Sequence, residues 1–133
     1  INTIREKCVN TKRVIIVDDD QFYVNLVSKI FIQRGWQTVI CSSMETALQS
    51  YNPKHVSLIV TDIFMPGMGG IEGIKFLRQT FPDSSIIAMS GGWDGMSPKA
   101  TVDAAIKIGA DAGLKKPITP EELDHVLGTL NIP

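Results

Sequence analysis

The chain has 133 residues, a length that suits one domain with a substantial core and is too short for two. Its composition is 44% hydrophobic and 20% charged with a net charge of −1, so charge alone gives no affinity for nucleic acid or membrane surfaces. Cys8 and Cys41 have no metal-ligand spacing and fit a reducing compartment. No apolar stretch approaches the roughly 20 residues of a membrane span, so we expect a cytoplasmic protein.

Apolar segments alternate with amphipathic segments five times along the chain. After a polar leader at residues 1–12, we expect one domain over residues 13–133. Its predicted strands are about Arg13 to Val17, Trp36 to Ile40, Ser57 to Thr61, Ser85 to Met89 and Ala112 to Lys115. Five strands, each followed by a helix, predict a doubly wound parallel sheet of the flavodoxin-like α/β class, with strand order 2-1-3-4-5 and helices on both faces.

Capping signals predict where several helices begin. Ser42 and Glu45 have the spacing of a capping box, and so do Thr119 and Glu122. Ser97 precedes a proline and is therefore a predicted N-cap. The buried stripe predicted for the helix that begins there is Val102, Ala105 and Ile106.

Carboxylates gather at the ends of two predicted strands. Asp18, Asp19 and Asp20 follow the first strand, and Asp62 follows the third. The predicted strand order reverses between these two strands, and such a reversal opens a crevice at their carboxyl ends. Crowded carboxylates repel one another unless a cation neutralises them, so we predict a Mg²⁺ site here. For Asp20, capping of the next helix is the simpler role.

Four motifs at predicted strand ends resemble those of the receiver domains of two-component response regulators. They are Val17-Asp18-Asp19, Thr61-Asp62-Ile63-Phe64-Met65-Pro66, Met89-Ser90-Gly91 and Lys116-Pro117. The resemblance implies that Asp62 is the phosphoacceptor, with a sensor histidine kinase or a histidine phosphotransfer protein as donor. A carboxylate is a competent nucleophile toward phosphorus once a metal cancels the repulsion between the two anions.

The resemblance also implies how Mg²⁺ is held. Asp19 and Asp62 would bind it through their side chains and Phe64 through its backbone carbonyl. Asp18 would act mainly through a metal-bound water. Such oxygen ligands suit Mg²⁺, which keeps several of its waters in proteins.

Three further residues would contact the phosphoryl group by the same resemblance. Lys116 would bring a positive charge to its oxygens, while the Ser90 hydroxyl and the Gly91 amide would donate hydrogen bonds to them. Taken alone, Lys116 would be a solvated surface lysine and Ser90 a cap or turn residue. Catalysis in such a site is positioning plus charge neutralisation.

Three features depart from the family pattern. Gly113 stands three residues before the lysine, where most receivers have an aromatic side chain whose rotation accompanies activation. The glycine-rich segment Gly91–Pro98 is about four residues longer than usual, and its Trp93 either packs on the core or is offered to a partner. Phe64 is bulky where the family often has a smaller or polar residue, so we expect slower self-dephosphorylation.

Alternatives to a working receiver remain open at this point. A receiver that never takes phosphate and acts only as an interaction module fits the same fold. A haloacid dehalogenase-type hydrolase would explain Asp18 and Asp20 but would normally need a longer chain, and a flavodoxin-type binder would not place three acids in its first loop.

The output also stays open. A stand-alone receiver, a relay shuttle and a domain severed from a longer protein are all compatible with a chain that begins at Ile1. We expect a downstream protein target or a fused output domain, a possible homodimer, and no direct contact with nucleic acid or membrane.

Overall fold

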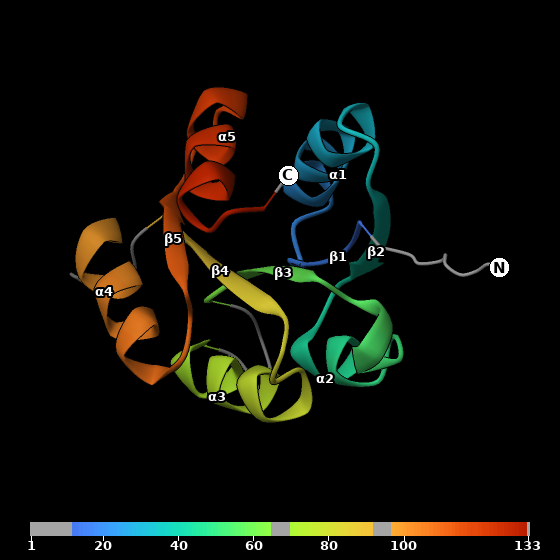
Figure 1. Ribbon diagram of the computed structural model, residues 1–133. Coiled ribbons are helices and arrows are strands. Elements are labelled where there is room, and N and C mark those ends of the chain that lie inside the picture. The colour runs from blue at the N-terminus through green and yellow to red at the C-terminus, as the bar shows by residue number, and fades with distance from the viewer. Residues whose placement is uncertain (1–11, 65–69, 92–96, 133) are drawn as a thin grey trace, which may run out of the picture.

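The computed structural model describes residues 12–64, 70–91 and 97–132. Its five strands form one parallel sheet in the order β2-β1-β3-β4-β5, so the predicted fold class is confirmed (Figure 1). None of the helices described is long and apolar enough to cross a membrane. The elements in chain order are β1 (Arg13–Val17), α1 (Gln21–Gln33), β2 (Gln37–Cys41), α2 (Met44–Leu48), the 3₁₀ turn η2 (Pro53–His55), β3 (Leu58–Asp62), α3 (Gly70–Thr80), β4 (Ser85–Ser90), α4 (Pro98–Ile108), β5 (Ala112–Lys115) and α5 (Pro120–Thr129).

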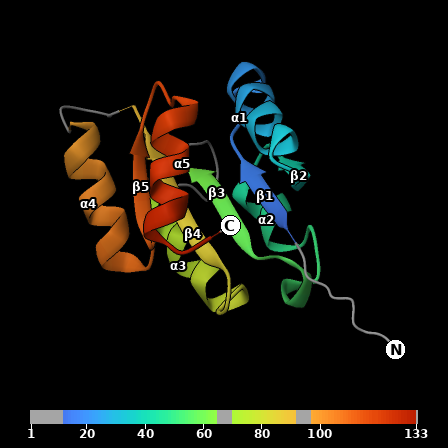
Figure 2. The same ribbon diagram turned by 45° about the horizontal axis from the view of Figure 1, so that its top comes forward.

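Alternating residues of the strands feed two apolar clusters, one on each face of the sheet. Val14 and Ile16 of β1 face α1 and α5, whereas Ile15 and Val17 face the other side, where α2, α3 and α4 pack. All four side chains are fully buried. Figure 2 shows α1 and α5 together on one side of the sheet, with α3 behind it. Burial on both faces explains why these strands are continuous apolar runs rather than alternating ones.

Two helix predictions need correction. The N-cap of α2 is Ser43, not Ser42, because β2 continues to Cys41 and the Ser43 hydroxyl accepts a hydrogen bond from the Thr46 amide. In α4 the side chain of Ile106 is 43% exposed, and its predicted inward position is wrong. The predicted caps Ser97 and Thr119 are confirmed, since each accepts a hydrogen bond from the amide three residues later.

The face of α4 that meets the sheet is set by its contact with β5. A methyl group added to Gly113 would lie 1.9 Å from Cγ1 of Val102, so the missing side chain is what lets the helix approach. The inner face of α4 is therefore centred on Thr101 and Ala105, both fully buried, and Ile106 is turned outward.

Candidate functional site

The parallel pairing of β1 and β3 brings the predicted acids together. Val17 is in register with Thr61, so the next residue of each chain segment, Asp18 and Asp62, emerges at the same edge of the sheet. Carboxylate oxygens of Asp18, Asp19 and Asp62 lie within 4.8 Å of one another. Asp18 and Asp62 are buried, whereas Asp19 is exposed to solvent.

Lys116 is the cation that reaches this cluster. Its Nζ donates to Oδ2 of Asp18 at 2.9 Å and lies 3.4 Å from Oδ1 of Asp62. Its backbone amide donates to the carbonyl of Ser90, the last residue of β4, at 2.9 Å. When all four side chains are ionised, the three acids and Lys116 together carry a net charge of −2.

Burial has an electrostatic consequence for Asp62. It raises the pKa of this carboxyl group to about 6, against the lowering effect of Lys116 and together with repulsion from Asp18. Burial would by itself lower the pKa of Lys116, but its hydrogen bond to Asp18 and the charges of both acids outweigh that effect and raise it. The lysine therefore stays charged, while Asp62 is destabilised as an anion until more positive charge arrives.

Both oxygens of Asp18 already have protein partners. Oδ2 accepts from Lys116, and Oδ1 accepts from the Asp20 amide at 3.0 Å. This arrangement is compatible with the predicted indirect role of Asp18 through a metal-bound water. Asp20 itself is the N-cap of α1, as predicted, because its carboxylate accepts hydrogen bonds from the amides of Phe22 and Tyr23.

The other predicted site residues lie around the same cluster. Ser90 is fully buried at the end of β4, and a methyl group added to Gly91 would lie 3.8 Å from Cβ of Lys116, so both residues adjoin the lysine. Phe64 is half-buried and packs against the apolar cluster on the α2 and α3 side, while its amide donates a hydrogen bond to Asp62. The predictions for Met65, Pro66, Gly92 and Trp93 concern positions outside the described residues.

One residue of this site was missed at the level of the sequence. The motifs assign no role at this site to Tyr23, yet its ring centroid lies 4.4 Å from Nζ of Lys116. Its hydroxyl accepts a hydrogen bond from the Ile118 amide at 2.8 Å. The available signal was an aromatic residue in the first turn of the helix that follows the three acids.

The donor set fits a hard divalent cation. The three clustered side chains offer only carboxylate oxygens, from the turn after β1 and from the last residue of β3, and these are the ligands that Mg²⁺ prefers. Asp19 is exposed to solvent, so a metal bound here would have room to keep several of its waters. The excess of two negative charges over Lys116 matches the charge of such an ion.

Comparison with known proteins agrees with this arrangement. A family model for the response regulator receiver domain matches residues 14–128. The chemotaxis protein CheY of Thermotoga maritima is 31% identical over 121 residues, which cover 90% of this chain and 98% of CheY. The autoinducer 1 sensor kinase/phosphatase LuxN of Vibrio campbellii is 33% identical over 86% of this chain, which spans only 13% of LuxN.

The fold comparison leads to the same group of proteins. The solution structure of the beryllofluoride-activated NtrC4 receiver domain dimer has a TM-score of 0.76 and 28% identity, covering 90% of this chain and 95% of that one. A family match over nearly the whole described chain decides against the hydrolase and the flavin-binding alternatives. The chain belongs to the response regulator receiver domain family.

Proposed function

We propose that the chain accepts a phosphoryl group on Asp62 from a phosphohistidine in a Mg²⁺-dependent reaction and thereby switches a protein-interaction surface. The observation that supports this most is the group of three carboxylates within 4.8 Å of one another with Lys116 in contact. A buried ion pair built only for stability would have balanced charge; this group has two more acids than cations.

Each residue of the cluster has a task in this proposal. Asp19, Asp62 and the Phe64 carbonyl hold Mg²⁺, with Asp18 acting through water. When bound, the metal supplies the positive charge that lets two anions approach. Lys116 pairs with a phosphoryl oxygen, and the Ser90 hydroxyl and Gly91 amide donate hydrogen bonds to the others.

The transfer needs no further co-reactant. An oxygen of Asp62 forms a bond to phosphorus as the bond between phosphorus and the histidine nitrogen breaks. The electron pair of the broken bond stays on the imidazole, and the carboxylate becomes a mixed anhydride. The protein contributes positioning and charge, as expected for phosphoryl transfer.

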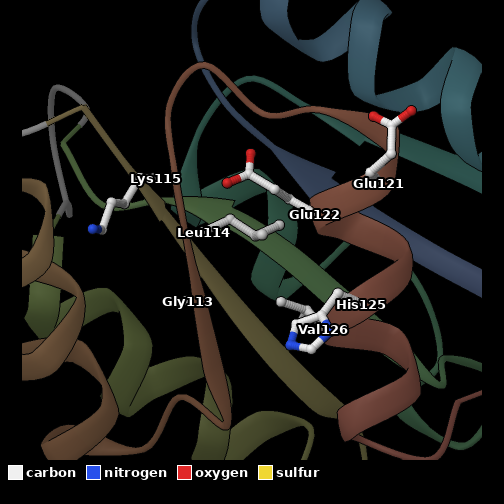
Figure 3. Close-up of a pocket in the computed structure, with 7 residues that line it drawn as sticks. All are labelled: Gly113, Leu114, Lys115, Glu121, Glu122, His125 and Val126. Atoms are coloured by element: carbon white, nitrogen blue, oxygen red, sulfur yellow. The ribbon is translucent and has the colours of Figure 1, made fainter.

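The partners follow from the same chemistry. The phosphoryl donor is a sensor histidine kinase or a histidine phosphotransfer protein, in the cytoplasm. The phosphorylated chain then acts on a protein target, a fused output domain or a second copy of itself. The family's common output face includes α4, β5 and α5. A pocket lies there between β5 and α5; Figure 3 shows Leu114 of β5 directed toward α5, beside Glu122 and Val126.

A second function, a module that never takes phosphate, is favoured by one observation. Gly113 removes the aromatic switch of the family, and Val102 occupies the space that a side chain there would need. Such a module would use the same surfaces without the chemistry.

Incubation with acetyl phosphate separates the two functions. The intact mass is measured with and without Mg²⁺, beside an Asp62→Asn control and a known receiver. We expect a Mg²⁺-dependent gain of one phosphoryl group that the Asp62→Asn protein lacks. No gain, under conditions that label the known receiver, would favour the phosphate-independent module.

A further inference from the structure

Among the described residues, the Lys116 ammonium lies close to two acids and one aromatic ring. Asp18 and Asp62 take two directions, at 2.9 and 3.4 Å. The third is the face of Tyr23, whose centroid is 4.4 Å from Nζ. An ammonium group has three N–H donors, and an aromatic face attracts a cation through its quadrupole, most strongly where water is excluded.

The same tyrosine also contacts the backbone that carries the lysine. Its hydroxyl accepts from the amide of Ile118 at 2.8 Å, two residues beyond Lys116. Pro117 has no amide hydrogen, so Ile118 supplies the first backbone donor after the lysine. One side chain of α1 thus fixes both the tip of Lys116 and the main chain at its base.

The acids and the tyrosine differ in what happens to them during the proposed reaction. Asp18 and Asp62 also serve the metal and the phosphoryl group, so their contacts with Lys116 change when these bind. The ring of Tyr23 is neutral, offers no strong ligand to Mg²⁺, and keeps its place on α1. Burial raises the pKa of its hydroxyl, which keeps the phenol uncharged.

We propose that Tyr23 is a positioning residue that holds Lys116 toward the phosphoryl group through its ring and through Ile118. This inference rests on the role of Lys116 in the proposed function. Tyr23 touches none of the reacting atoms; it acts by limiting where the ammonium can move once the acids have other partners.

The chain contains a matched control. Its second tyrosine, Tyr51, also lies against a cation, with its ring centroid 4.3 Å from the guanidinium carbon of Arg13. Arg13 begins β1, at the end of the sheet opposite the acids. Tyr51→Leu therefore removes an aromatic ring and its contact with a cation but leaves the residues of the acidic site unchanged.

The test compares Tyr23→Leu, Tyr23→Met and Tyr23→Phe with Tyr51→Leu in phosphorylation by acetyl phosphate at saturating Mg²⁺. Loss of the ring should lower the rate about tenfold, whereas Tyr23→Phe, which loses only the hydroxyl, should lower it about twofold. Tyr51→Leu should match the wild type. The Met variant fills the space with a flexible chain, in case Tyr23→Leu does not fold.

Combining the Tyr23 variants with Lys116→Met tests whether Tyr23 acts through the lysine. In Lys116→Met protein, removing the Tyr23 ring should have no further effect on the rate. Within each background, wild type or Lys116→Met, the Tyr23 variants should keep Mg²⁺ affinity within about twofold, because neither the carboxylates nor residue 116 differ between them. Wild-type rates in the Tyr23 variants would overturn the proposal. So would a tenfold loss that persists in the Lys116→Met background, since that loss would reflect the fold alone.

A readout without phosphate keeps this inference separate from the proposed function. In protein labelled with ¹⁵N-lysine, the Lys116 ammonium should give a slowly exchanging signal in wild type and Tyr51→Leu that is lost in Tyr23→Leu. If the wild type takes up no phosphoryl group, the proposed function fails, and this signal alone decides whether Tyr23 positions Lys116. An unchanged signal in Tyr23→Leu would then overturn the positioning role.

Discussion

Charged clusters lie at both ends of the sheet, and they are built differently. At the amino ends of β4 and β5, Arg78 donates to the carbonyls of Gly109 and Ser84 and to the carboxylate of Asp111. Asp111 in turn accepts from the amide of Ile86. One cation meets one anion, and backbone groups take the remaining hydrogen bonds.

The carboxyl ends of β1 and β3 have the opposite balance. Among the described residues, three acids share a small volume with one cation, Lys116, and burial makes ionisation of Asp62 less favourable than in water. The comparison teaches that balanced charges with many backbone partners support the fold, whereas an excess of one sign prepares a site for a ligand of the other sign. Substitutions at the two ends should therefore have opposite effects on stability.

The largest effect is expected from Arg78→Ala at the balanced end. Its loss leaves the carbonyls of Gly109 and Ser84 without a donor and Asp111 without its cation, so the free energy of unfolding should fall by about 2–4 kcal/mol in urea titrations. Lys99→Ala is the control, since its pair with Asp103 is exposed and should contribute less than about 0.5 kcal/mol. Equal losses in both variants would contradict this ranking.

At the other end, Asp62→Asn should stabilise the metal-free protein at neutral pH. The pKa of Asp62 is about 6 in the folded protein, above its ordinary value of 3.8. As pH rises from about 4 to about 6, the unfolded chain releases this proton first, so the Asp62 contribution to wild-type stability falls across that window and then stays level. Asp62→Asn lacks this fall and should be more stable at pH 7.5 by on the order of 1–3 kcal/mol.

Mg²⁺ gives an independent check on the same carboxylate. Because protons compete with the metal at Asp62, Mg²⁺ affinity of the wild type should weaken as pH falls below about 6. Added Mg²⁺ should stabilise the wild type more than Asp62→Asn. If the free energy of unfolding of the two metal-free proteins changed in parallel with pH, burial would not be raising the pKa of Asp62.

These two clusters also show what the sequence could and could not predict. Asp18, Asp19 and Asp62 were identifiable because each lies at the carboxyl end of a strand whose apolar run is plain in the sequence, and parallel pairing then brings strand ends together. The partner of Lys116 could not be inferred in this way. Its bond to Asp18 joins residues 98 positions apart, and the geometry of the turn after β5 decides which acid it meets.

The same limit applies to contacts made by helices. Periodicity and capping signals identified the helices and most of their caps. The same patterns placed Ile106 on the wrong side of α4 and assigned Tyr23 no role at the site. Both outcomes depend on how a helix is rotated and seated on the sheet. For α4 that seating follows from the absent side chain of Gly113, which hydrophobic patterning does not register.

Gly113→Ala should cause a smaller loss of stability than Arg78→Ala. The added methyl would lie 1.9 Å from Cγ1 of Val102, which forces α4 away from β5 and should lower the free energy of unfolding by about 1–3 kcal/mol. Val102→Ala should relieve part of this, so the double variant should lose less than the two single losses together.

Gly128→Ala serves as the control for Gly113→Ala. An added methyl at Gly128, in α5, meets nothing within 4 Å, and alanine should raise stability there by about 0.5 kcal/mol. Mg²⁺ affinity should be unchanged in both proteins because the acids are not touched. A Gly113→Ala protein as stable as the wild type would show that α4 is free to shift.

The smallest effect concerns an apolar residue at the acidic end. Phe64 is half-buried against the apolar cluster beneath α3, and its amide donates to Asp62. If its ring hinders an attacking water, phosphorylated Phe64→Asn should lose phosphate about threefold faster than the wild type, measured as decay of the intact-mass signal. Phe64→Leu keeps an apolar side chain and should decay at the wild-type rate. Since part of the side chain already packs on the core, only its exposed remainder can block water, which is why the expected change is modest. Equal lifetimes for the wild type and the Phe64→Asn protein would contradict this role of the ring.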